Sequence, residues 1–186
     1  MINARIKSLF LLAILLLPLL VSNGKAVANE MPDFIGYHVE TPKLVGQGEY
    51  QRLFWKIYLA RLYARDGIYK PDHAFALQLE YQRDLKADDI VEMSIGLIED
   101  QGVSDLNKLA HWQTQLAAII PDIRKGDQLT GIQLNEKSFF YLDDKPIGEI
   151  TDAELSQYFF DIWLGENTTA PELRKTLIGQ RSPNPQ

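Results

Sequence analysis

Two arginines and three tyrosines lie on segments that are otherwise rich in apolar residues. Arg52 belongs to residues 51–65, which read QRLFWKIYLARLYAR, and Arg83 closes an alternating run at residues 75–83. A guanidinium binds a carboxylate or a phenolate through paired hydrogen bonds, and a phenol hydroxyl can donate to the same anion. The candidate ligand-binding residues are Arg52, Arg83, Tyr50, Tyr58 and Tyr81.

A purely structural role is the alternative for each of these side chains. Both arginines fall near predicted strand ends, where they can extend to water or pair with Glu49, Glu80 or Asp84. The tyrosines can belong to the core, with each hydroxyl satisfied locally, and this is the role we expect for Tyr63.

The sequence gives little support for thiol, metal, serine-nucleophile or nucleotide sites. The chain has no cysteine, which excludes disulfides, thiol nucleophiles and a lipid anchor on cysteine. His38, His73 and His111 lack the spacing of metal ligands, and no G-x-S-x-G motif is present. We therefore expect no metal and no cofactor. The pair Gly46-x-Gly48 lacks a third glycine, so we expect a bulge or a close backbone approach there and not a nucleotide site.

The apolar patterns predict two groups of strands. Residues 43–54, 55–65 and 75–83 form the first group, and residues 128–134, 138–142 and 146–150 form the second. Within 55–65 neither face is plainly polar, which indicates a strand covered on both sides. Residues 75–83 alternate between apolar and polar side chains, which indicates a half-buried strand.

Helical periodicity predicts four helices. One spans residues 87–101, and Ser104 is expected to cap a second that Pro121 ends. Thr151-x-x-Glu154 reads as a capping box for a third, with Gly165 as its C′ residue, and Pro171 opens the last. Strands, a helical pair, more strands and two closing helices predict an α+β domain.

The N-terminal 28 residues have the features of a signal peptide. Two basic residues precede an apolar stretch at 9–21, and Ala26-Val27-Ala28 supplies a cleavage site. A retained N-terminal anchor is the alternative. We expect cleavage after Ala28, a periplasmic location, one domain at residues 29–180, and a flexible tail at 181–186.

The charge of the mature chain limits its partners. Removing residues 1–28 takes away three of the 19 basic residues and none of the 25 acidic ones, which leaves a net charge of −9. Nucleic acids and anionic membrane surfaces attract positive proteins. We therefore expect neither nucleic acid nor membrane as a partner after cleavage. The sequence does not predict an oligomeric state.

Two segments together are similar to one family. Residues 46–63, GQGEYQRLFWKIYLARLY, resemble the glycine-rich strand and the following strand of chalcone isomerase and its relatives, and best match the exported bacterial branch. Residues 159–165, FFDIWLG, and 173–177, LRKTL, resemble the closing pattern of that family. The resemblance implies an open-faced β-sandwich, a large antiparallel sheet with a layer of helices on one face, and a ligand cleft between them.

The resemblance also implies two kinds of activity. The enzymes of the family close a flavonoid ring with a strand arginine, a threonine and tyrosines, whereas other relatives bind fatty acids without catalysis. Here Tyr50 stands in place of that arginine, Tyr58 in place of the threonine, and Arg61 in place of a glycine. Arg52, two residues along the same strand, is the substitute that we expect.

The leading hypothesis is a periplasmic protein that binds a small, apolar or amphipathic, fatty-acid-like anion without transforming it. The first alternative is an intramolecular lyase or isomerase acting on an enone or phenolic substrate through Arg52 and Tyr58. The second is a protein-interaction role in the envelope, with side chains closing the cleft.

Overall fold

The computed structural model describes residues 31–180, in which six strands form one antiparallel sheet. Each strand pairs with the next along the chain, so the order across the sheet is also the order in the sequence. The predicted signal peptide and flexible tail lie outside the described residues. The strands are β1 (Pro42–Arg52), β2 (Trp55–Arg65), β3 (Phe75–Tyr81), β4 (Gln128–Leu134), β5 (Lys137–Leu142) and β6 (Lys145–Ile150).

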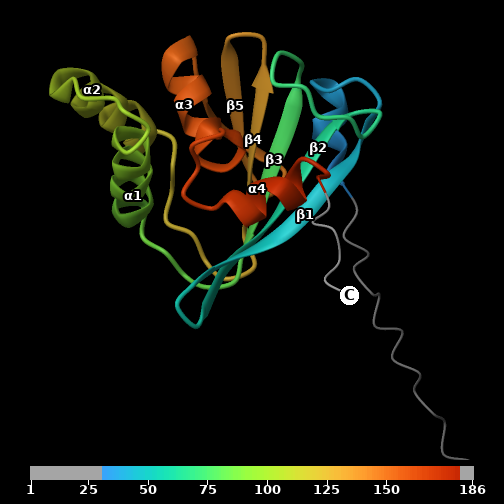
Figure 1. The fold of residues 1–186 in the computed structure, drawn as a ribbon, viewed down its shortest axis with the longest axis horizontal. Helices are drawn as coiled ribbons and strands as arrows, with labels where there is room; N and C mark the ends of the chain where they lie inside the picture. The colour runs from blue at the N-terminus through green and yellow to red at the C-terminus, as the bar shows by residue number, and fades with distance from the viewer. Residues whose placement is uncertain (1–30, 181–186) are drawn as a thin grey trace, which may run out of the picture. The chain divides into compact units, whose positions relative to one another are not determined.

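Four α-helices cover one face of this sheet. Figure 1 shows α3 and α4 lying across the strands, with α1 and α2 beside them. The large apolar core joins side chains from these helices to one face of the sheet. The predicted fold class, α+β with a helical layer on one face, is confirmed. The helices are α1 (Ala87–Glu99), α2 (Leu106–Ala117), α3 (Ala153–Leu164) and α4 (Pro171–Leu177).

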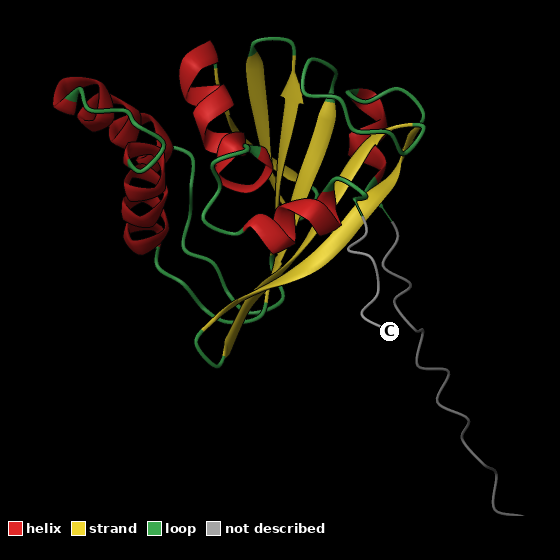
Figure 2. Ribbon diagram, viewed as in Figure 1, coloured by secondary structure: helices red, strands yellow, loops and turns green. Residues whose placement is uncertain are grey.

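A short 3-10 helix, η1 (Asp33–Tyr37), covers part of the opposite face. Phe34 and Ile35 are buried there in a second, smaller apolar cluster that includes Tyr63, Ala76 and Ile132. The segment that leads into the sheet therefore occupies part of a face that the helical layer leaves uncovered. Figure 2 draws η1 and the four α-helices in the same red, and the strands of the sheet in yellow.

Burial along the strands differs from the predicted patterns in two places. In β2, residues 60–64 are buried on both faces, but the strand begins with the exposed Trp55 and Lys56. Double coverage is therefore correct for the second half of β2 only. The prediction of a half-buried β3 is wrong because η1 covers Ala76 on the second face, and Gln78 is also buried there.

The residues that end the helices also differ from those predicted. Asp105 caps α2 by accepting hydrogen bonds from the backbone of Asn107 and Lys108, in place of Ser104. Asp152 caps α3 in the same way, in place of Thr151. Gly165 has φ of −67° and is not the left-handed C′ residue that we expected. In both helices, the cap is a carboxylate one residue after the expected hydroxyl, and it accepts from two backbone N–H groups of the first turn.

The glycine pair in β1 permits a close contact with α4. A Cβ atom on Gly46 would lie 2.0 Å from the carbonyl oxygen of Thr176, and one on Gly48 would lie 2.8 Å from Leu173 Cδ1. The pairing of β1 with β2 also shifts between Leu44 and Gly46. The predicted bulge and close backbone approach are both present, and they let α4 pack directly on the strand.

Replacing Gly46 with alanine should destabilise the protein. The new methyl group meets backbone atoms of α4, so we expect the free energy of unfolding to fall by about 1–3 kcal/mol. Urea unfolding followed by circular dichroism measures this loss.

Gly96→Ala is the matched control. Nothing lies within 4 Å of a Cβ at this exposed position inside α1. Alanine has the higher helix propensity, so this variant should gain about 0.5–1 kcal/mol. Equal stability of Gly46→Ala and the unmodified protein would contradict the close packing of α4 on β1.

Candidate functional site

Three tyrosines form a row across the first three strands. Tyr50 of β1 pairs with Tyr58 of β2, and Tyr58 pairs with Tyr81 of β3. The rings of Tyr50 and Tyr58 stack with centroids 5.1 Å apart, and Tyr81 meets Tyr58 edge to face at 5.7 Å. Register places three phenols side by side on the sheet face that the helices cover.

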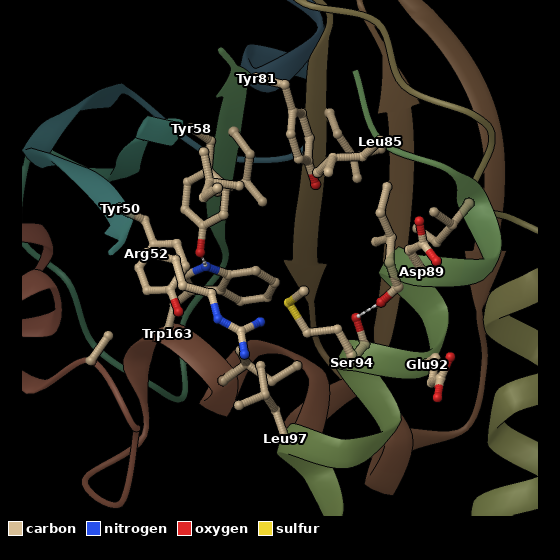
Figure 3. Close-up of a pocket in the computed structure, with 18 of the residues that line it drawn as sticks. Tyr50, Arg52, Tyr58, Tyr81, Leu85, Asp89, Glu92, Ser94, Leu97 and Trp163 are labelled. Atoms are coloured by element: carbon tan, nitrogen blue, oxygen red, sulfur yellow. Dashed lines mark hydrogen bonds between the residues drawn. The ribbon is translucent and has the colours of Figure 1, made fainter. Parts of the chain in front are cut away.

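This row lines a pocket of about 570 Å³ between the sheet and the helices. Figure 3 shows the tyrosines on one side of it and residues of α1 on the other. All five predicted site residues, including Arg52 and Arg83, contribute to its lining. Most of the wall is apolar and is formed by side chains such as Leu79, Leu85, Ile90, Leu97, Phe159 and Ile162.

A hydrogen bond from α3 fixes the central tyrosine. The indole Nε1–H of Trp163 donates to the hydroxyl oxygen of Tyr58 at 2.9 Å. An indole nitrogen can only donate, so the Tyr58 oxygen is the acceptor and its own proton remains available. The Tyr58 hydroxyl can therefore act as a hydrogen-bond donor to another group.

Burial keeps the inner phenols protonated. Loss of hydration raises the pKa of Tyr58, which the Trp163 hydrogen bond opposes only in part, and it also raises the pKa of Tyr81. Desolvation disfavours the charged phenolate. Both hydroxyls are therefore neutral donors near neutral pH, and neither is poised to act as a base.

The side chain of Arg52 has no hydrogen bond or ion pair with any residue in the described range 31–180. It is exposed and belongs to the pocket lining. Figure 3 shows its guanidinium turned toward the space between the tyrosines and α1. A free guanidinium at the edge of an apolar pocket can hold an anionic group.

Arg83 has a different setting. Its guanidinium carbon lies 5.5 Å from the ring centroid of Trp55, in a cation–π arrangement. This contact holds Arg83 against the β1–β2 turn while leaving it in the lining of the pocket.

The ion pairs that we gave as the alternative for Arg52 and Arg83 are not formed. Each of the three acids has another partner: Glu49 accepts from Lys56 at 2.8 Å, Glu80 from Arg61 at 2.9 Å, and Asp84 from the backbone of Lys125 at 2.8 Å. The sequence placed these acids near the arginines but could not assign the competing donors.

The opposite wall depends on the placement of α1. A carboxylate oxygen of Asp122 accepts from the first backbone N–H of the helix at 3.0 Å, and Lys86 binds the other oxygen at 2.7 Å. Asp89 and Glu92 then reach the pocket from α1. The hydroxyl of Ser94 donates to the carbonyl of Ile90 at 2.8 Å, so its proton is already used.

Arg61, which replaces a glycine of the enzymes, is not a pocket residue. It is buried and donates to Gln78 at 3.4 Å and to Glu80 at 2.9 Å. These partners share its strand face, opposite the tyrosine row. Arg61 therefore does not add a third guanidinium to the pocket lining, beside those of Arg52 and Arg83.

Trp163 and Met93 are pocket residues that the sequence analysis missed. Trp163 lies at core spacing in α3, which indicates packing against the sheet. Periodicity finds the inward face of a helix without showing where that face meets a cavity. Predicting that the Trp163 indole N–H bonds to Tyr58 would have required knowledge of the strand register.

The closed cleft of the protein-interaction hypothesis is not present. Trp55, a large side chain that could fill such a cleft, is 64% exposed at the β1–β2 turn. Tyr58 packs against the core cluster but leaves the adjoining volume open.

Within residues 31–180, no group of three or more histidine, aspartate or glutamate side chains is arranged to hold a metal ion. The same part of the chain contains no helix with the length and hydropathy needed to cross a bilayer.

Removing the buried phenol of Tyr81 should change how stability depends on alkaline pH. Its pKa is raised in the folded state, so the unfolded chain loses this proton first, near pH 10. Stability is therefore intact below pH 10 and falls by about 1.4 kcal/mol per pH unit above it, for this one group.

Tyr81→Phe should have a shallower fall in urea midpoint between pH 9.5 and 11 than the unmodified protein. Tyr37→Phe is the control, because Tyr37 is 81% exposed and its phenol faces water in both states. Identical slopes for Tyr81→Phe and the unmodified protein would contradict the burial of this hydroxyl.

Comparisons with known proteins agree with this fold. The model of the family described as chalcone isomerase-like matches residues 25–179. A Haemophilus influenzae protein, described only as uncharacterized, is 26% identical over 141 residues, which cover 75% of this chain and 69% of that protein.

A solved structure of an Arabidopsis thaliana fatty-acid binding protein superposes with a TM-score of 0.57 at 13% identity. The match covers 75% of this chain and 88% of that one. At this identity the likeness establishes the fold. The family match spans most of the chain, and the observed sheet with its helical layer agrees with it. The chain therefore belongs to the chalcone isomerase-like family.

Proposed function

We propose that this protein is a periplasmic binder of a small apolar anion, such as a fatty acid, and that it does not transform its ligand. The observation that carries the proposal is the position of Arg52. Its unpaired guanidinium lies in the lining of an apolar pocket, beside a row of phenols.

The pocket has the size and polarity that small ligands require. Its volume of about 570 Å³ falls in the usual range for ligand sites, roughly 300–1,000 Å³. Aliphatic and aromatic side chains cover most of its wall and offer an acyl chain no competing hydrogen bonds. Such a surface favours an alkyl or aryl body over a sugar or a nucleotide.

The polar groups define where the anionic end would lie. Arg52 supplies a charge, and Tyr58 supplies a proton that Trp163 leaves free. On α1, Asp89 and Glu92 contribute acidic groups to the opposite wall. A carboxylate would therefore be repelled from α1 and drawn toward the tyrosine row.

Similarity to known proteins supports the same class of ligand. The Arabidopsis protein of this fold is described as a fatty-acid binding protein. The two chains share the fold, and in this chain a pocket lies between the sheet and the helical layer.

An intramolecular lyase acting on an enone is the second candidate function. Arg52 and the Tyr58 proton could stabilise a developing enolate as well as a carboxylate. Chalcone cyclisation by the purified protein, with a rate that falls in Arg52→Ala, would favour this candidate over simple binding.

Arg52→Gln should selectively weaken the binding of fatty acids. Losing a charged hydrogen bond costs about 1.5–3 kcal/mol, which corresponds to roughly a 10- to 150-fold rise in Kd. The fatty alcohol of the same chain length should bind the variant and the unmodified protein with similar affinity. Isothermal titration calorimetry measures all four combinations.

Arg65→Gln is the matched control, because Arg65 is an exposed arginine at the other end of the β1–β2 hairpin, where it pairs with Glu40 at 2.8 Å. It should leave both affinities unchanged. Equal affinity of Arg52→Gln and the unmodified protein for the acid would rule out Arg52 as the anion-binding group.

Export gives a separate prediction. Expressed with its own N-terminus in a Gram-negative host, the protein should accumulate in the periplasm with Asn29 as its first residue. Intact mass spectrometry of the periplasmic fraction measures the cleavage point. A protein that keeps residues 1–28 would support the retained anchor instead.

A further inference from the structure

The turn between β1 and β2 exposes three consecutive large apolar side chains. Leu53 is 86% exposed, Phe54 is 96% exposed, and Trp55 is 64% exposed. Figure 1 shows the end of this hairpin extending past the neighbouring strands, away from α2. We refer to Leu53, Phe54 and Trp55 as the apolar tip.

The geometry of the turn does not require these residues. Arg52 pairs with Trp55, so only two residues connect the strands, and Leu53 has φ of 57°. Asparagine, aspartate and glycine adopt this left-handed conformation more readily than leucine does, and they are typical of such turns. The fold alone therefore gives no reason for leucine and phenylalanine here.

Basic side chains surround the apolar tip. Arg52 and Lys56 flank it in the sequence, and Arg83 lies over the ring of Trp55. Glu49 pairs with Lys56 but with neither arginine. The mature chain carries a net charge of −9, so this local excess of positive charge contrasts with the rest of the protein.

We propose that the apolar tip inserts into the surface of an anionic phospholipid bilayer. Leucine, phenylalanine and tryptophan would enter the boundary between head groups and acyl chains, as in other shallow membrane anchors. Arg52 and Arg83 would remain at the level of the lipid phosphates, because long cationic side chains extend to the interface.

This proposal changes the expectation of no membrane partner, which followed from net charge alone. Net charge describes the average field of the protein, whereas attraction to a bilayer falls off within a Debye length, about 8–10 Å. A cationic, apolar hairpin end can therefore dock while the acidic remainder of the protein stays in water.

The tip adjoins the pocket, because Arg52 and Arg83 line the pocket and also flank the tip. A docked hairpin would bring the pocket close to the lipid phase, where an amphipathic ligand concentrates. This role in ligand exchange rests on the proposed function, whereas docking itself does not.

Tryptophan fluorescence with ligand-free lipid vesicles tests the docking alone. Trp112 and Trp163 are buried, so Trp55 is the exposed reporter. Vesicles of phosphatidylcholine with about 30% phosphatidylglycerol should shift the emission to the blue. Sedimentation with the same vesicles should recover the protein, and recovery should fall at about 0.5 M salt.

The double variant Leu53→Asn, Phe54→Ser should bind these vesicles at least about tenfold more weakly. Asparagine suits the left-handed backbone at residue 53, so the hairpin should keep its shape. Leu106→Asn is the control, because Leu106 is 73% exposed on α2, away from the hairpin, and it should bind normally.

Three outcomes would overturn the proposal. The first is no emission shift and no sedimentation with anionic vesicles. The second is equal binding by the double variant and the unmodified protein. The third is an emission shift that depends on protein concentration without vesicles, which would mean that the tip contacts a second copy of the chain. None of these outcomes bears on fatty-acid binding by the pocket.

Discussion

The hydrogen bond from Trp163 to Tyr58 connects the helical layer to the sheet at the boundary between the core and the pocket. An indole N–H in an apolar region needs an acceptor, since an unpaired one costs about 1–3 kcal/mol. The Tyr58 oxygen provides that acceptor across 105 positions of sequence. The same bond pairs the indole N–H of α3, holds the central phenol of the row, and leaves the phenol proton free to donate.

The two ends of β2 serve different purposes. Residues 60–64 are buried on both faces, between the large core and the cluster under η1. Toward the other end, burial decreases through Tyr58 to the exposed turn, and the pocket lies along this transition. Residues 60–64 of β2 therefore contribute most to stability. The half of β2 toward the turn is less buried and carries the polar and exposed groups that are available for binding.

Much of the fold was predictable from the sequence, because periodicity and turn residues determine individual elements. The strand and helix boundaries were close, and the family resemblance supplied their arrangement. The errors have physical causes. Asp105 and Asp152 were better placed than Ser104 and Thr151 to reach the backbone donors. The lead-in segment covered a face of β3 that the alternating pattern had left to solvent.

The candidate site was only partly predictable. Strand parity placed Tyr50 and Arg52 on one face, and the structure brings both into the pocket lining with Tyr58, Tyr81 and Arg83. That Tyr58 lies between the other two phenols depends on register, which a single sequence does not specify.

The residues of α1 that line the pocket could not be predicted, because helical periodicity does not show which residues of a helix face a cavity. The sequence also did not indicate that Lys56, Arg61 and Lys125 would bind the acids nearest to Arg52 and Arg83.

A crystal structure of the mature protein soaked with palmitate tests the central claim most directly. We expect the acyl chain between the tyrosine row and α1, with its carboxylate within hydrogen-bonding distance of Arg52 and the Tyr58 hydroxyl. A pocket that stays empty at saturating palmitate, or a carboxylate held away from both residues, would contradict the proposed binding site.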